Sequence, residues 1–275
     1  MISFAVIVGS LALATFVPVY ASLYLLPALK VRERYLAAFG VGLAFWFFYD
    51  TMGEAASLGE NRSLYPFYLF GGFPHLMLIG AFVAGVAVLA FFDQASVPVP
   101  GRTPSRNATF LIPAAVALVM GVHGLGEGWS AVSAVASAPS TGSYLQTLIQ
   151  AFVTFPALVS YPIHKFLEAG IVAILYAVYL KGGPGSGRWW EVPLLGLLFA
   201  GPSAVGAALG YFYSFDTTYL FAFGVTAALY ATVRLVEPIG SGVEGKGRVP
   251  AHYGPEVFGF LALGILLLYF AALLH

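Results

Sequence analysis

The feature that most constrains this chain is a series of eight apolar stretches, each long enough to cross a membrane. A helix needs about 20 mostly apolar residues to span the hydrocarbon core of a bilayer. These stretches are too long and too continuously apolar for the alternating strands of a membrane barrel, so we expect helices. The predicted spans are 2–28, 35–57, 67–92, 109–136, 146–180, 190–213, 217–236 and 256–274.

The chain has too few charges to cover a surface in water. Only 9% of its 275 residues are charged, against about a quarter in a soluble domain. The formal net charge is zero, which argues against nucleic acid as a partner. The absence of cysteine excludes disulfides and thiolate metal sites. We therefore predict a single all-α transmembrane domain over 1–275, integral to the lipid bilayer of the plasma membrane.

The basic residues predict the orientation. Ten of the twelve lie in or beside the odd-numbered connections, and the exceptions are Arg62 in the second connection and Lys165 inside the fifth span. Connections rich in Lys and Arg face the cytoplasm, so both termini are predicted to lie outside. Met1 to Leu29 carries no charge, unlike the basic start of a signal peptide, and we interpret it as a retained span.

A short sequence echo indicates an internal repeat. Phe39-Gly40-Val41 in the second span recurs as Phe223-Gly224-Val225 in the seventh. In the predicted orientation these two spans run in opposite directions. We interpret the echo as part of an inverted repeat that relates spans one to three to spans six to eight, with spans four and five between them. Such 3+2+3 inverted repeats are typical of transporters that bind their substrate near the midplane.

Ionisable residues inside a membrane are costly, and they are functional by default. Away from the ends of the predicted spans they are Asp50, Glu54, His75, His123, Glu127, His164, Lys165 and Glu168. Four of them form two copies of His-x-x-x-Glu, a spacing that puts both side chains on one helix face. His123 lies about 21 Å along its span from Thr109, close to the middle of the membrane.

Two such faces on consecutive antiparallel spans are predicted to converge on one metal ion. Two imidazoles and two carboxylates suit Zn, Fe, Mn, Co or Cd, and they suit Ca or Mg poorly. One copy alone would be interpreted as a hydrogen bond between helix turns, whereas two copies at matching depth favour metal binding. The predicted ligands are His123, Glu127, His164 and Glu168.

These motifs resemble those of the ZIP family of divalent-metal transporters, which has eight spans and both termini outside. The family carries His-Asn-x-x-Glu-Gly in its fourth span, matched here by His123, Glu127 and Gly128, and His-x-x-x-Glu in its fifth, matched by His164 and Glu168. The resemblance is to a divergent, prokaryotic-type member. It implies transport of a divalent metal, zinc foremost, into the cytoplasm by alternating access. The metal would be the transported substrate, with no prosthetic group and no enzymatic activity implied.

The chain also departs from the family pattern. Relatives often have Asn after the first motif His and a polar or acidic residue after the second, and Gly124 and Lys165 stand there in this chain. The usual prolines before the motif glutamates are Gly126 and Leu167, and the His-rich third connection is the short, His-free 93–107. We expect the site to hold a single metal ion, with the fixed positive charge of Lys165 taking the place of a second metal ion. The other interpretation is that Lys165 snorkels toward the cytoplasm.

Four further polar residues are candidates for the pathway. Asp50 and Glu54 are one turn apart near the outer end of the second span, where they would attract cations. Alternatively, Asp50 would reach the metal as an additional ligand. Glu54 is equally compatible with a position in the outer headgroup region. Ser203 follows Pro202, whose ring frees a backbone carbonyl in mid-span. A lone His75 is more typical of helix packing than of a ligand.

Two other functions are compatible with the sequence. An intramembrane zinc hydrolase acting on lipid substrates would use His123, His164 and one glutamate as ligands and the other glutamate as base, although such enzymes usually have three histidines near one membrane face. A bis-His haem protein ranks last, because the adjacent glutamates would be poor neighbours. A homodimer is compatible with any of the three.

The topology is testable by cysteine labelling, because the chain has no native cysteine. Cysteines introduced at Gly59 and Ser143 should react with an impermeant thiol reagent from outside, and one at Gly101 only after permeabilisation. The reverse pattern would contradict the span count or its orientation.

Overall fold

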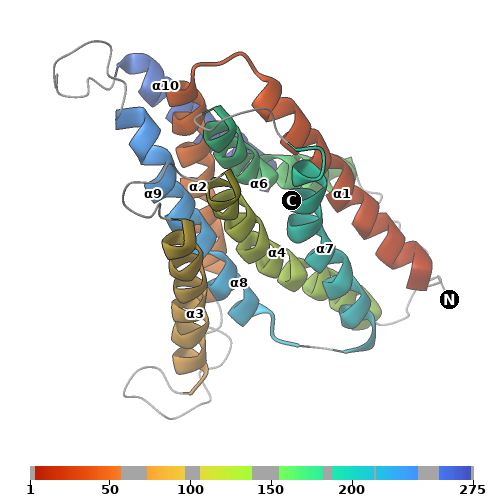
Figure 1. Cartoon of the computed structure of the whole chain (residues 1–275). Coiled ribbons are helices and arrows are strands. Elements are labelled where there is room, and N and C mark those ends of the chain that lie inside the picture. Colours follow the sequence, from red (N-terminus) through yellow and green to blue (C-terminus); the bar gives the residue numbers. More distant parts are fainter. Residues whose placement is uncertain are drawn as a thin grey trace, which may run out of the picture.

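A computed structural model describes residues 4–56, 73–96, 106–137, 155–181, 188–213, 215–240 and 254–273. These residues are helical throughout apart from short connections, which confirms the predicted all-α fold (Figure 1). The helices are α1 (Phe4–Ala28), α2 (Glu33–Ala56), α3 (Phe73–Ser96), α4 (Arg106–Ser137), α6 (Phe155–Lys181), α7 (Glu191–Phe212), α8 (Thr218–Gly224), α9 (Thr226–Gly240) and α10 (Pro255–Leu273).

Seven of the described helical segments are long and apolar enough to cross a membrane, with α8 and α9 counted as one. They correspond to the first seven predicted spans. The eighth predicted span is α10, whose described apolar part, Pro255–Ala271, is shorter. The predicted beginnings of the third and fifth spans, 67–72 and 146–154, lie outside the described residues, as do Gly59, Gly101 and Ser143.

The seventh predicted span differs from the expected single helix over 217–236. Val225 forms a turn that separates α8 from α9. The Thr226 hydroxyl donates to the carbonyl oxygen of Phe223 at 2.7 Å, a local bond that competes with regular helix pairing. The same carbonyl lies against Gly85 of α3. The break therefore falls where α8 is in close contact with a neighbouring helix.

α6 lies at the centre of the bundle and α3 at its periphery (Figure 1). Every residue of α6 from Ala169 to Val178 is buried, so protein surrounds this helix on all faces for about three turns. The helices that pack on it are α1, α2, α4, α9 and α10. A helix that is apolar on all faces is stable when all its faces are covered. Protein covers α6, whereas most of α3 is available to contact lipid.

The most extensive helix contact joins α4 to α7, and glycines permit it. A side chain at Gly121 or Gly128 of α4 would collide with a carbonyl oxygen of α7, and one at Gly206 or Gly210 of α7 with a carbonyl oxygen of α4. Small residues that let backbones approach are a main source of helix association in membranes. This contact fits the small-xxx-small spacing of Gly206 and Gly210, and it fixes the helix that carries His123.

A polar cluster joins one end of α3 to α9. The Arg234 guanidinium pairs with the Asp93 carboxylate. The Tyr230 hydroxyl donates to Asp93 Oδ1 at 2.5 Å and accepts from Arg234 Nε at 3.1 Å. This Asp93–Tyr230–Arg234 cluster lies at the end of the bundle that the basic residues predict to be cytoplasmic. Because α3 is otherwise thinly covered, the cluster is a principal attachment of that end.

The glycine contact predicts a position-specific loss of stability. Gly206→Ala should lower the free energy of unfolding by about 1–3 kcal/mol, because its methyl group has to displace backbone rather than a flexible side chain. Gly80→Ala on α3 is the matched control, because no atom lies within 4 Å of the added carbon. Thermal unfolding in detergent measures both. Equal transition temperatures for the two variants would contradict the close α4–α7 contact.

Candidate metal centre

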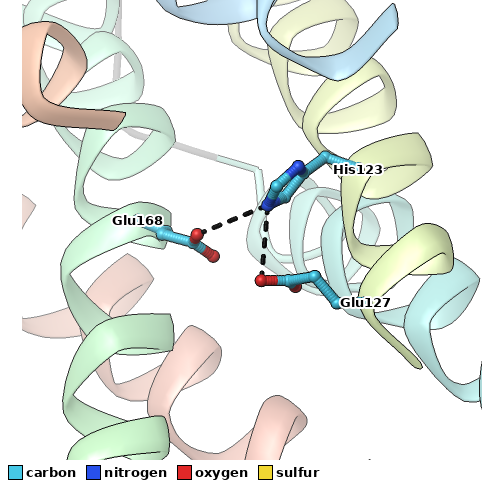
Figure 2. A group of neighbouring side chains, drawn as sticks. All are labelled: His123, Glu127 and Glu168. Carbon is cyan, nitrogen blue, oxygen red and sulfur yellow. Dashed lines mark ion pairs between the residues drawn. The ribbon is translucent and has the colours of Figure 1, made fainter. Parts of the chain in front are cut away.

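Three of the predicted ligands come together between α4 and α6. Figure 2 shows His123 and Glu127 of α4 pointing toward Glu168 of α6. His123 Nε2 lies 3.3 Å from Glu127 Oε1 and 3.7 Å from Glu168 Oε1. One donor atom from each residue lies within 4.8 Å of the other two. One imidazole nitrogen and two carboxylate oxygens therefore face a common point, as a metal site requires.

The group is withdrawn from solvent but not sealed. His123 is 3% exposed and Glu168 1%, whereas the Glu127 side chain retains 19% of its surface. Burying a carboxylate is costly unless a cation or hydrogen-bond donors compensate it. Glu127 is therefore the member of the group that retains accessible surface.

His164, the fourth predicted ligand, is held to one of the other three. Its Nε2 lies 2.8 Å from Glu168 Oε1, and the residue is 7% exposed. Glu168 Oε1 therefore lies between two imidazoles, His123 and His164. The tightest group has three members rather than four, and His164 is one hydrogen bond away from it.

Lys165 faces the carboxylates. Its Nζ contacts Glu127 Oε2 and lies 2.5 Å from Glu168 Oε2, and the residue is 1% exposed. The ammonium also lies 5.6 Å from the centre of the Tyr161 ring, within the range of a cation–π interaction. The side chain is thus directed into the site and does not extend along α6 toward the cytoplasmic end.

Aromatic and glycine residues from α2 and α8 hold the His123 ring. Phe47 packs edge-on at 4.9 Å between ring centres, and Phe221 packs at 5.1 Å. Gly224 lies so close that a side chain there would collide with His123 Cβ. Within the described part of the chain, His123 Nδ1 has no hydrogen-bond partner. Packing therefore does the orienting that a hydrogen bond to the second ring nitrogen usually does in metal sites.

The sequence missed Phe47 and Phe221 as residues of this site. The chain has 24 phenylalanines, and nothing in their spacing distinguishes these two. Gly224 did carry a signal, because it belongs to the repeated Phe-Gly-Val triplet, although the triplet did not reveal that this glycine lies against a predicted ligand.

The other polar candidates from the sequence differ in how close they lie to the group of His123, Glu127 and Glu168. Asp50 of α2 is partly buried and interacts electrostatically with all four predicted ligands. Ser203 of α7 is 1% exposed and lies beside Gly124, the residue after His123. Glu54 and His75 occupy α2 and α3, but their side chains are outside the described part of the structure.

Comparison of the chain with protein-family models, with curated proteins and with solved structures found no match. The fold and the site together define a multi-pass helical membrane protein with a buried His/Glu group suited to a metal ion.

The geometry predicts which carboxylate matters for metal binding. Glu168→Gln should weaken Zn²⁺ or Cd²⁺ binding by at least about tenfold, because an amide oxygen replaces an anionic ligand between two imidazoles. Glu237→Gln is the matched control, since Glu237 is an exposed carboxylate on α9. Equilibrium dialysis of the purified protein measures both. Equal metal affinity in the two variants would show that Glu168 is not a metal ligand.

Proposed function

We propose that this protein transports divalent transition-metal ions, with zinc as the favoured cargo, across the plasma membrane into the cytoplasm. The observation that carries the proposal is the convergence of His123, Glu127 and Glu168 on one buried point between two membrane helices. Their nitrogen and oxygen donors suit Zn, Fe, Mn, Co and Cd. His164 is the proposed fourth ligand. Its imidazole would turn away from Glu168 Oε1 toward the metal. The ion is cargo, and no prosthetic group takes part.

The packing of the helices supports an inverted 3+2+3 repeat, and with it alternating access. The proposed symmetry exchanges the first three spans with the last three, and α4 with α6. α1 packs on α6 as α7 packs on α4, and α2 packs on α6 as α8 packs on α4. α2 also packs on α10 as α8 packs on α3. Each of these contacts in one half thus has a counterpart in the other.

The Phe-Gly-Val triplets support the same symmetry at single residues. The carbonyl oxygen of Phe39 lies against Gly264 of α10, and that of Phe223 lies against Gly85 of α3. The adjoining glycines are also close to neighbouring helices, since Gly40 packs against Leu235 of α9 and Ile174 of α6, and Gly224 packs against His123 of α4. The two copies therefore contact corresponding helices in corresponding ways, which gives the short sequence echo a physical basis.

The distribution of burial supports a conformation closed on the cytoplasmic side. On that side of Glu168, the buried stretch of α6 from Ala169 to Val178 leaves no exposed residue, and the Asp93–Tyr230–Arg234 cluster ties α3 to α9. On the other side, the Glu127 side chain retains exposed surface. Release into the cytoplasm would then require the packing around α6 to open. Movement at the break between α8 and α9 would reach the site directly through Gly224 and His123.

Hydrolysis of a lipid is less well supported. A hydrolase needs a carboxylate that is free to take a proton from water. Each glutamate here has one oxygen facing His123 and the other on Lys165. The two carboxylates thus have the same pair of partners, whereas a hydrolase would need one of them to differ from the other as the base.

Flux into proteoliposomes tests the proposal. His123→Ala and Glu168→Ala should each abolish nearly all Zn²⁺ uptake, because each removes one of three converging donors. His75→Ala should leave most of it, since a lone histidine in a span is more typical of helix packing than of a metal ligand. Undiminished uptake in the His123 variant would refute the site. Turnover of lipid amides without metal flux would favour the hydrolase instead.

A further inference from the structure

Each of the two carboxylates of the site directs its two oxygens at different partners, an imidazole nitrogen and an ammonium. The Oε1 atoms of Glu127 and Glu168 face His123 Nε2 at 3.3 and 3.7 Å. The Oε2 atoms of the same residues face Lys165 Nζ. The carboxylates therefore form two parallel bridges, with the predicted metal position at one end and an ammonium at the other.

This is the arrangement that bridging carboxylates adopt between two metal ions, where each oxygen binds a different cation and the ions lie about 3.5–4 Å apart. Here the second cation is covalently attached to the chain. Lys165 precedes Glu168 by three residues, which places both side chains on one face of α6. Glu127 reaches the same ammonium from α4, so the lysine closes the group from both helices.

We propose that Lys165 is a tethered cation that occupies the second position of this carboxylate-bridged pair, so that the site holds a single metal ion and holds it loosely enough to release it. The inference rests on the proposed transport function and deepens it, since it concerns the number of ions bound and the rate at which they leave.

The charges show why release depends on the lysine. With neutral imidazoles, the two carboxylates and the ammonium carry one net negative charge, and a dication brings the site to one net positive charge. Without the ammonium the empty site carries two negative charges and the loaded site none. In a poorly screened interior a charge at this distance changes the affinity strongly. The lysine therefore lowers the affinity for a metal ion while it prevents repulsion between the empty carboxylates.

A purely structural crosslink between α4 and α6 makes a different prediction. If Lys165 only held the helices together, its loss would separate the two carboxylates and weaken both binding and flux. If it is a competing cation, its loss would strengthen binding while maximal flux falls. If Lys165 is a competing cation, its loss therefore raises metal affinity and lowers flux. If it is a structural crosslink, its loss lowers both.

The experiment measures bound metal and flux in the full-length chain with Zn²⁺ and Cd²⁺ as probes. The wild type should bind one ion per chain by equilibrium dialysis. Lys165→Gln should still bind one, about tenfold more tightly, with a lower KM and a lower maximal flux. Lys165→Asp should bind a second, weaker ion, because it supplies a carboxylate where the ammonium was. Lys165→Arg keeps the charge and should keep a stoichiometry of one.

Several outcomes would overturn the inference, and they are distinguishable from failure of the transport proposal. Two ions per wild-type chain would show that the lysine does not occupy the second position, and this result needs no variant. Weaker binding by Lys165→Gln, with the wild-type elution volume and unfolding temperature, would indicate a structural crosslink. If that variant does not fold, a stoichiometry of one in a folded Lys165→Asp protein overturns the inference. A wild type that binds no metal at all would instead refute the proposed function.

Discussion

The structure depends on mutual compensation among three charged side chains buried in the middle of a membrane protein. The Lys165 ammonium contacts both Glu127 and Glu168 between α4 and α6, and the lysine and Glu168 are almost fully withdrawn from solvent. Any one of them alone would be prohibitively costly in this position. Their pairing therefore requires α4 and α6 to be held at a fixed separation and register.

Much of the surrounding packing maintains that separation. Glycines bring α4 against α7, so the helix bearing His123 and Glu127 is anchored on its outer side. α6 is enclosed by five other helices, which anchors Lys165 and Glu168. Phe47, Phe221 and Gly224 then restrict the His123 ring. Under the proposed transport function, this packing would have to open toward the predicted cytoplasmic end, and the same opening would disturb the candidate metal site.

The sequence predicted the helices well because a bilayer imposes one rule on all of them, a long apolar run with every backbone group paired internally. It also predicted three residues that the structure brings together, His123, Glu127 and Glu168, because an ionisable residue in such a run is conspicuous. The spacing of His123 and Glu127 then placed both on one face of α4. The break at Val225 was not predictable, since it arises from a local hydroxyl bond and from the approach of α3. The bond between His164 and Glu168, which leaves a group of three, depends on side-chain rotation that spacing does not encode.

The central claim is that a transported metal ion lies between His123, Glu127 and Glu168, with the Lys165 ammonium on the far side of both carboxylates. Anomalous diffraction from crystals grown with Cd²⁺ or Zn²⁺ tests it most directly, because it places the ion among named atoms. The account predicts one anomalous peak per chain, next to His123 Nε2 and the Oε1 atoms of the two glutamates. A peak between their Oε2 atoms, with Lys165 displaced, or no peak near these residues in metal-loaded protein, would contradict it.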